Sequence, residues 1–214
     1  MLAKGEIDQI KTACDELGSK RVIALSVAAG SRVLPAYQAY SEARRQVRGH
    51  GLVHDGMVGI WRVLRARPRA SAAEIAPLIV EAIRRAEADF KLINETEEQT
   101  LPEELAAQSI TAATHALRAY LEEPRMNAFH TLAVALEIDV VWAESEADGP
   151  NLEGVVSRSH LLAHYGQQMR DAAALAAVEE AEEKRLFRDI AMRAEREGLP
   201  YLLRMRDLVP PAAG

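Results

Sequence analysis

The sequence predicts an all-α protein, because of its composition and the spacing of its apolar residues. Ala, Leu, Glu and Arg, which are good helix formers, dominate the 214 residues, whereas aromatic residues make up only 5%. Apolar residues recur at intervals of three and four along most of the chain, and no segment keeps the alternation of a strand or a repeat of fixed period. We therefore expect a single-domain bundle of about eight helices with a long C-terminal helix.

Glycine and proline mark the ends of the first expected helices. Apolar residues at helical spacing over 7–17 are followed by Gly18, a residue typical of a helix C-terminus. Segment 22–33 is apolar on nearly every side, which is usual for a helix at the centre of a bundle. Pro35 is expected to break or kink this helix and to begin another over 36–47.

Capping signals and turns delimit the expected helices in the middle of the chain. Thr100 and Glu103 have the spacing of a capping box, and so do Ser71 and Glu74. The strongest turn signal is the Asp148–Asn151 cluster. The apolar stripes around these signals predict helices over 53–64, 75–93, 106–120 and 126–143.

The residues after 151 are expected to form one long helical stretch. It extends over 152–197, with Gly154 and Gly166 as the points at which it could be interrupted. Gly198–Pro200 has the order of glycine and proline that ends helices, and a short amphipathic piece follows over 201–208. We divide the chain into a helical core domain (1–150), a long C-terminal helical segment packed on the core or used in assembly (151–208), and a frayed tail (209–214).

Composition excludes several classes of protein. The 32 acidic and 26 basic residues give a formal charge of −6, and 49% of the residues are apolar, which excludes disorder of the whole chain. No apolar run approaches the ~20 residues of a membrane-spanning helix, and the start of the chain is too charged for a secretory signal. A single cysteine excludes a disulfide framework. We expect a cytoplasmic protein with no membrane association and no cofactor.

Familiar catalytic motifs are missing from the sequence. It holds no glycine-rich phosphate loop, no dinucleotide fingerprint and no nucleophile elbow. Cys14 lies on the apolar stripe of its helix, which indicates a buried structural thiol and not a nucleophile. We therefore assign no catalytic residue, and an enzyme is the less favoured class.

Histidine pairs are the one pattern that could hold a metal. His160 and His164 are four residues apart, so both rings leave the same side of a helix and could share an ion. This side lies roughly 200° from the apolar stripe, and we expect both rings to face away from the core. His50 and His54 repeat the spacing beside two glycines. A metal-binding bundle, or a metal-dependent enzyme, that uses His160 and His164 is one alternative, although a solvated helix face is the simpler interpretation.

Charge is unevenly distributed along the chain. Segment 44–69 holds seven arginines and one acid, whereas 87–104 holds seven acids and 137–153 holds six. Mutual neutralisation between helices is the simplest interpretation. The acidic segments could instead attract a basic protein, and the arginines could contact nucleic acid, which is the less expected of the two. The residues that we expect on an acidic binding surface are Glu97, Glu98, Glu144 and Glu146.

The least generic stretch is Pro35–Glu42, Pro-Ala-Tyr-Gln-Ala-Tyr-Ser-Glu. It resembles the Pro-x-Tyr-x-x-aromatic-Ser-Glu signature of the bacterial YjaG-like family, a helical family of unknown function. An Ala-rich helix before it and a helix with Trp61 after it also look similar, so the resemblance could span 10–194. It implies an all-helical single domain and brings no catalytic residues. The loop 94–100 and the tail 201–214 depart from the family's pattern.

Four residues of this stretch are candidate binding residues: Tyr37, Tyr40, Ser41 and Glu42. Two tyrosines three residues apart share one face of a helix and often form a half-buried pair. The favoured interpretation is therefore that both tyrosines pack into the core and that Glu42 pairs with an arginine.

The leading functional hypothesis is a non-catalytic helical domain that binds another protein. Its most concrete form is a bacterial immunity or antitoxin-like inhibitor, because an acidic surface promotes fast capture of a basic partner. A homodimer is a further expectation. Metal binding and nucleic-acid association are the alternatives.

Overall fold

Helix α2 stands at the centre of the fold, in contact with α3, α5, α6, α7 and α8. The computed structural model describes residues 4–66, 72–95, 98–147 and 155–209. These residues form eight helices and no strand, so the all-α prediction is confirmed. The helices are α1 (Lys4–Glu16), α2 (Ser19–Ala43), α3 (His50–Arg65), α4 (Ala72–Ile93), α5 (Leu101–Leu121), α6 (Pro124–Ala147), α7 (Val155–Ala177) and α8 (Glu183–Leu208).

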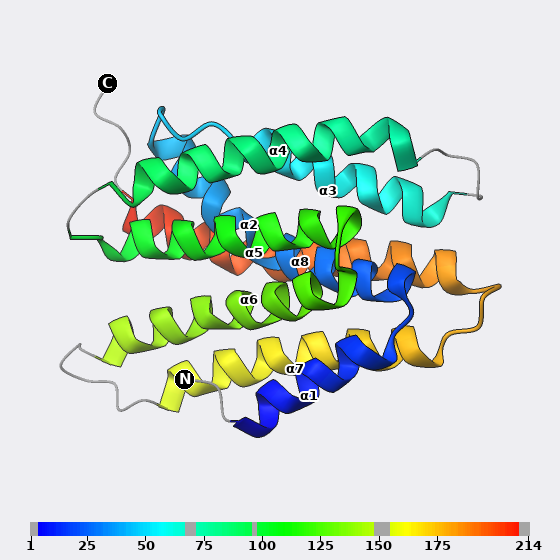
Figure 1. Cartoon of the computed structure of the whole chain (residues 1–214). Coiled ribbons are helices and arrows are strands. Elements are labelled where there is room, and N and C mark those ends of the chain that lie inside the picture. Colours follow the sequence, from blue (N-terminus) through cyan, green and yellow to red (C-terminus); the bar gives the residue numbers. More distant parts are fainter. Residues whose placement is uncertain (1–3, 67–71, 96–97, 148–154, 210–214) are drawn as a thin grey trace.

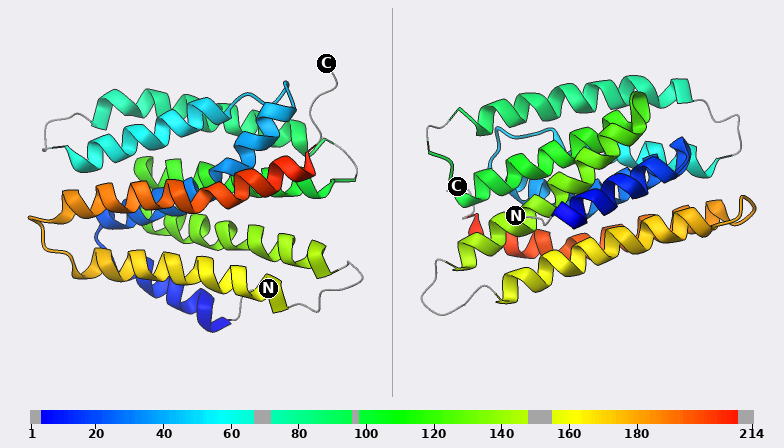
Figure 2. Two further views of the ribbon diagram at one scale, coloured as in Figure 1. Left: turned by 180° about the vertical axis from the view of Figure 1, so that it is seen from behind. Right: turned by 60° about the horizontal axis from the view of Figure 1, so that its bottom comes forward.

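The other helices surround α2 in layers (Figure 1). The pair α3 and α4 lies on one side, α5 and α6 pack against α2 and each other, and α7 and α1 lie on the opposite side. Seen from behind, α8 runs between α3 and α7 (Figure 2). Its main neighbour is α2, so the C-terminal segment packs on the core.

The apolar character of α2 explains its central place. Its residues Val22–Ala29 are buried apart from a partly buried Ile23, as expected for a helix without a polar face. Small residues also let its neighbours approach closely: a Cβ at Gly30 would lie only 2.9 Å from Cβ of Ala116 on α5.

Helix α2 continues through Pro35. The prediction of a break there and of a separate helix over 36–47 is wrong. Proline removes one backbone donor, so the carbonyl of Ser31 loses its partner within the helix. Neighbouring helices bury α2 on both sides of the proline, and this packing outweighs the local cost. The helix ends at Ala43, before Arg44 takes an extended conformation.

The C-terminal stretch folds back on itself and does not form one long helix. A turn separates α7, which ends at Ala177, from α8, which begins at Glu183. Arg21 of α2 explains the place of this turn: its guanidinium donates to the carbonyl of Val178 at 2.9 Å and to Glu183 at 3.0 Å. One side chain thus satisfies a carbonyl at the end of α7 and neutralises the first residue of α8. Gly166 lies within α7 and does not interrupt it.

The helix boundaries expected around this turn are also wrong. The acidic run 179–185, expected to lie inside the helical stretch 152–197, contains the turn, and its Glu183 is buried beside two basic residues of α2. Gly198 and Pro200 lie inside α8, which continues to Leu208. The expected short helix at the C-terminus is therefore the last part of α8.

The expected capping box before α5 is confirmed, since Glu103 accepts a hydrogen bond from the backbone N–H of Thr100 at 2.8 Å. The box that begins at Ser71, the turn at 148–151 and residues 210–214 of the expected frayed tail lie outside the described residues. Val209, the first residue of that tail, is not frayed: it is buried and its backbone N–H donates to the carbonyl of Met205 at the end of α8. None of the described helices combines the length and apolar character that a membrane crossing requires.

Candidate functional site

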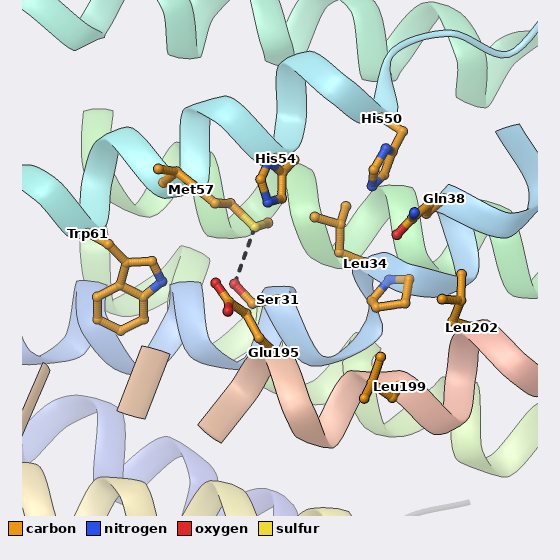
Figure 3. Close-up of a pocket in the computed structure, with 12 residues that line it drawn as sticks. Ser31, Leu34, Gln38, His50, His54, Met57, Trp61, Glu195, Leu199 and Leu202 are labelled. Atoms are coloured by element: carbon orange, nitrogen blue, oxygen red, sulfur yellow. Dashed lines mark hydrogen bonds between the residues drawn. The ribbon is translucent and has the colours of Figure 1, made fainter. Parts of the chain in front are cut away.

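A pocket of about 180 Å³ lies between α2, α3 and α8 (Figure 3). Apolar side chains form most of its wall: Leu34, Pro35, Met57, Val58, Trp61, Leu199 and Leu202. Its polar residues are Ser31, Gln38, His50, His54 and Glu195. An apolar cavity with a few polar groups is the usual form of a small-ligand site.

Gly198 lets α8 approach α2 closely beside the pocket. A Cβ at this position would lie 2.8 Å from the carbonyl oxygen of Arg32 and 3.0 Å from Cγ of Pro35. Glycine is therefore required here by helix packing and not by a helix end. The close approach places Glu195, Leu199 and Leu202 of α8 against the α2 wall of the pocket.

Asp89 of α4 anchors the start of α3. Its carboxylate accepts hydrogen bonds from the backbone N–H of Gly49, at 2.6 Å, and from the hydroxyl of Tyr37. A Cβ at Gly49 would lie 2.5 Å from that hydroxyl, so only glycine fits. The next residue, His50, is held edge-on to the Tyr37 ring with the centroids 5.8 Å apart.

The His50 ring is a neutral polar group in the pocket. Burial, and then the neighbouring His54, lower its pKa to about 4. The two ring centroids are 6.3 Å apart, and both side chains line the pocket (Figure 3). Within the described part of the chain, the His50 ring makes no hydrogen bond. It can therefore offer one donor and one acceptor to another molecule.

Glu195 is the carboxylate of the pocket wall. It is exposed, and it projects from α8 toward the α3 side of the pocket (Figure 3). No ion pair or hydrogen bond joins its carboxylate to the other described residues, and no lysine or arginine is among the lining residues. The pocket thus has one uncompensated negative charge at its edge.

The Pro35–Glu42 stretch forms the last turns of α2, before the connection to α3. Tyr37 and Tyr40 are buried, as the favoured interpretation required. Ser41 donates to the carbonyl of Val47 at 2.7 Å, and Glu42 pairs with Arg206 of α8 at 2.7 Å. All four side chains thus have partners within the protein, whereas Pro35 and Gln38 of the same stretch face the pocket.

The acidic residues predicted for a binding surface are only partly placed. Glu98 and Glu144 are exposed, at the end of the bundle where α5 begins and α6 ends (Figure 1). Glu97 lies outside the described residues, and so does the side chain of Glu146. Other acids of the two segments are neutralised internally, for example Glu87 by Arg118.

His160 and His164 lie in different surroundings. His164 is buried, with Nδ1 2.7 Å from Asp139 and 2.9 Å from the hydroxyl of Tyr201, so the expectation that it faces away from the core is wrong. The reason is that α7 packs against both α6 and α8 and is covered on more than one side. His160 is exposed and accepts a hydrogen bond from Arg204 at 2.9 Å. Among the described residues, no three His, Cys, Asp or Glu side chains are grouped to hold a metal.

A buried polar network between α2, α7 and α8 was not predicted from the sequence. Arg32 is fully buried and pairs with Asp171 and, at 2.7 Å, with Glu197. Arg193 also contacts Asp171. Nη1 of Arg32 has no hydrogen-bond partner in the described part of the chain. An arginine inside the apolar run of α2 was the available signal, because a charge in such a run needs buried partners.

Comparison with known proteins identifies a relative by fold only. No protein-family model matches the chain, and neither does any curated protein. One solved structure is similar, a DUF416 family protein from Shewanella baltica OS155, with a TM-score of 0.60 and 14% sequence identity. The match covers 86% of this chain and 93% of that chain. The two proteins therefore share the helical fold, while the resemblance to the YjaG-like family stays a prediction.

Proposed function

We propose that this protein binds a small, largely apolar ligand in the pocket between α2, α3 and α8. The observation that supports this proposal is an apolar cavity in which the His50 ring has no hydrogen-bond partner among the described residues. The ring is partly buried and both of its nitrogens are without partners in the described part of the chain, so a ligand that displaces water from the pocket can form a hydrogen bond with it.

The proposal is tested by filling the pocket. Val58 lines the pocket, and Val58→Phe places a ring inside it. Val80 on α4 is 56% exposed and does not line the pocket, so Val80→Phe is the matched control. The probe is 2-phenylethanol, and its binding is followed by NMR at the Trp61 indole N–H.

We expect a saturable shift of the Trp61 signal in the natural protein and in Val80→Phe, and its loss in Val58→Phe. Circular dichroism before the titration confirms that both variants are folded. Absence of a saturable shift in the natural protein, or an equal shift in a folded Val58→Phe variant, contradicts the proposal.

A basic protein partner, as expected of an inhibitor, is the second function that we propose. Its support is the position of Glu98 and Glu144 at one end of the bundle (Figure 1), where neither carboxylate pairs with another described residue. For a partner isolated with the tagged protein, the association rate should fall when both are replaced by lysine. Glu180→Lys, in the turn between α7 and α8, is the control. An unchanged rate in the double variant removes this hypothesis.

A further inference from the structure

We infer that the pocket selects an organic ammonium ion: a ring-sized apolar body that carries one protonated amine. This inference rests on the proposed function, since it assigns a chemical class to the ligand of the same pocket. The charge, the size and the aromatic wall of the pocket support it.

The charge of the wall favours a cation. Glu195 is its one carboxylate, and the lining residues include no lysine or arginine to neutralise it. The nearest arginines along α8 are engaged elsewhere: Arg193 pairs with Asp171, and Arg196 donates to a carbonyl of its own helix. An anionic ligand would meet Glu195 without any basic lining residue to compensate for the repulsion.

The aromatic and sulfur-containing wall also suits an ammonium ion. Trp61 lines the pocket and is only 5% exposed, so its ring is held in place by the surrounding core and a ligand can reach a small part of it. A cation near the face of a tryptophan is stabilised by about 0.5–1 kcal/mol, and by more where water is excluded. The thioether of Met57 lies on the same side of the pocket (Figure 3) and is an apolar, polarisable contact.

The volume limits the apolar body to about one ring. The pocket measures about 180 Å³, and an apolar cavity of ~150 Å³ in another protein binds benzene. This size favours a free aromatic amine over a lysine side chain of a protein, because the linear lysine chain leaves the ring-shaped space unfilled.

Three probes of matched shape test the inference: 2-phenylethylammonium, 2-phenylethanol and 3-phenylpropanoate. Binding is measured by NMR at low salt and about pH 8, well above the ordinary histidine pKa of about 6.5 and below that of an alkylamine. We expect the ammonium ion to bind about tenfold more tightly than the carboxylate, through the pairing with Glu195 and the contact with Trp61.

Two charge variants isolate the role of Glu195. In Glu195→Gln, the affinity for the ammonium ion should fall about threefold or more, while that for the alcohol stays within about twofold. Asp207→Asn removes the same charge near the end of α8, outside the pocket, and should change neither affinity. Equal affinities for the three probes, or an unchanged ammonium affinity in Glu195→Gln, overturn the inference.

The failures of the inference and of the proposed function are distinguishable. If the three probes bind equally and Val58→Phe abolishes binding, the pocket binds ligands but does not select ammonium ions. If no probe gives a saturable shift at Trp61, the proposed function itself fails. A fourth probe, Nα-acetyl-lysine amide, should bind more weakly than 2-phenylethylammonium. Tighter binding of that probe would overturn the inference that the ligand is a free amine and would favour a lysine side chain of a protein.

Discussion

Replacement of Gly198 by alanine tests the close packing of α8 on α2 beside the pocket. The new methyl group would lie 2.8 Å from the carbonyl oxygen of Arg32, 3.0 Å from Cγ of Pro35 and 3.3 Å from the carbonyl oxygen of Ser31. Two of these atoms belong to the backbone of α2 and cannot move aside like the end of a flexible side chain. The two helices must therefore separate by several tenths of an ångström, an estimate that follows from ordinary carbon–oxygen contact distances.

Two opposing contributions determine the change in the free energy of unfolding of Gly198→Ala. Alanine is more favourable than glycine in a helix interior by about 1 kcal/mol. Overpacking a close-packed contact typically costs about 1–3 kcal/mol, and rigid backbone neighbours place this contact in the upper part of that range. We expect a net loss of about 1–2 kcal/mol in the free energy of unfolding of Gly198→Ala.

Urea denaturation followed by circular dichroism measures this loss. Gly166→Ala in α7 is the matched control, because a Cβ there would meet no atom within 4 Å. It should gain about 0.5–1 kcal/mol from helix propensity alone. The two variants should thus change stability in opposite directions. If Gly198→Ala is as stable as the natural protein or more stable, α8 does not approach α2 as closely as described. The close packing that places Glu195, Leu199 and Leu202 against α2 in the pocket wall is then refuted.

Three further predictions concern buried polar groups. Tyr201→Phe removes a hydroxyl that donates to the buried carboxylate of Asp139 and should lower the free energy of unfolding by about 1–3 kcal/mol in urea denaturation. Tyr120→Phe is the control and should not destabilise the protein, because the buried hydroxyl of Tyr120 has no partner among the described residues. Arg32→Met removes the buried cation that Asp171 and Glu197 share, although Arg193 still pairs with Asp171, and should cost about 3 kcal/mol by the same assay, a loss that a purely apolar role for this side chain would not produce. The pKa of His50 is about 4 in the folded protein, below its ordinary value of about 6.5, so the unfolded chain takes up the proton first as the pH drops. The free energy of unfolding should therefore fall between about pH 6.5 and pH 4, and in His50→Gln this fall should be smaller by up to about 3 kcal/mol. Urea denaturation across this range measures the difference, and parallel curves for the two proteins would contradict the prediction.

Local features of the sequence predicted the helices well. The capping box at Thr100 and Glu103, the glycine after the first helix and the apolar run of α2 each depend on residues a few positions apart, and the structure has helices where they indicate. The burial of Tyr37 and Tyr40 followed from their spacing on one face. Such signals are readable because helix formation depends on neighbours in sequence.

The errors all arose where distant residues outweigh local preference. Pro35 and Pro200 would end an isolated helix, but α2 and α8 pack along each other and continue through both. The turn after α7 has no glycine or proline; it is stabilised by Arg21, which lies far away in sequence. His164 is buried because a second helix covers the side of α7 that periodicity alone assigns to solvent.

Composition and periodicity were enough to predict the fold class, the central helix and the lack of familiar catalytic motifs, because they are properties of short segments. The pocket could not be predicted in this way, because it forms only when the helices pack. Its wall combines His50 and Trp61 of α3 with Pro35 of α2 and Glu195 of α8, and no local spacing relates residues of the three helices. They meet because Gly198 allows two helices to approach and Asp89 holds the start of a third, and such long-range contacts form only when the whole bundle packs.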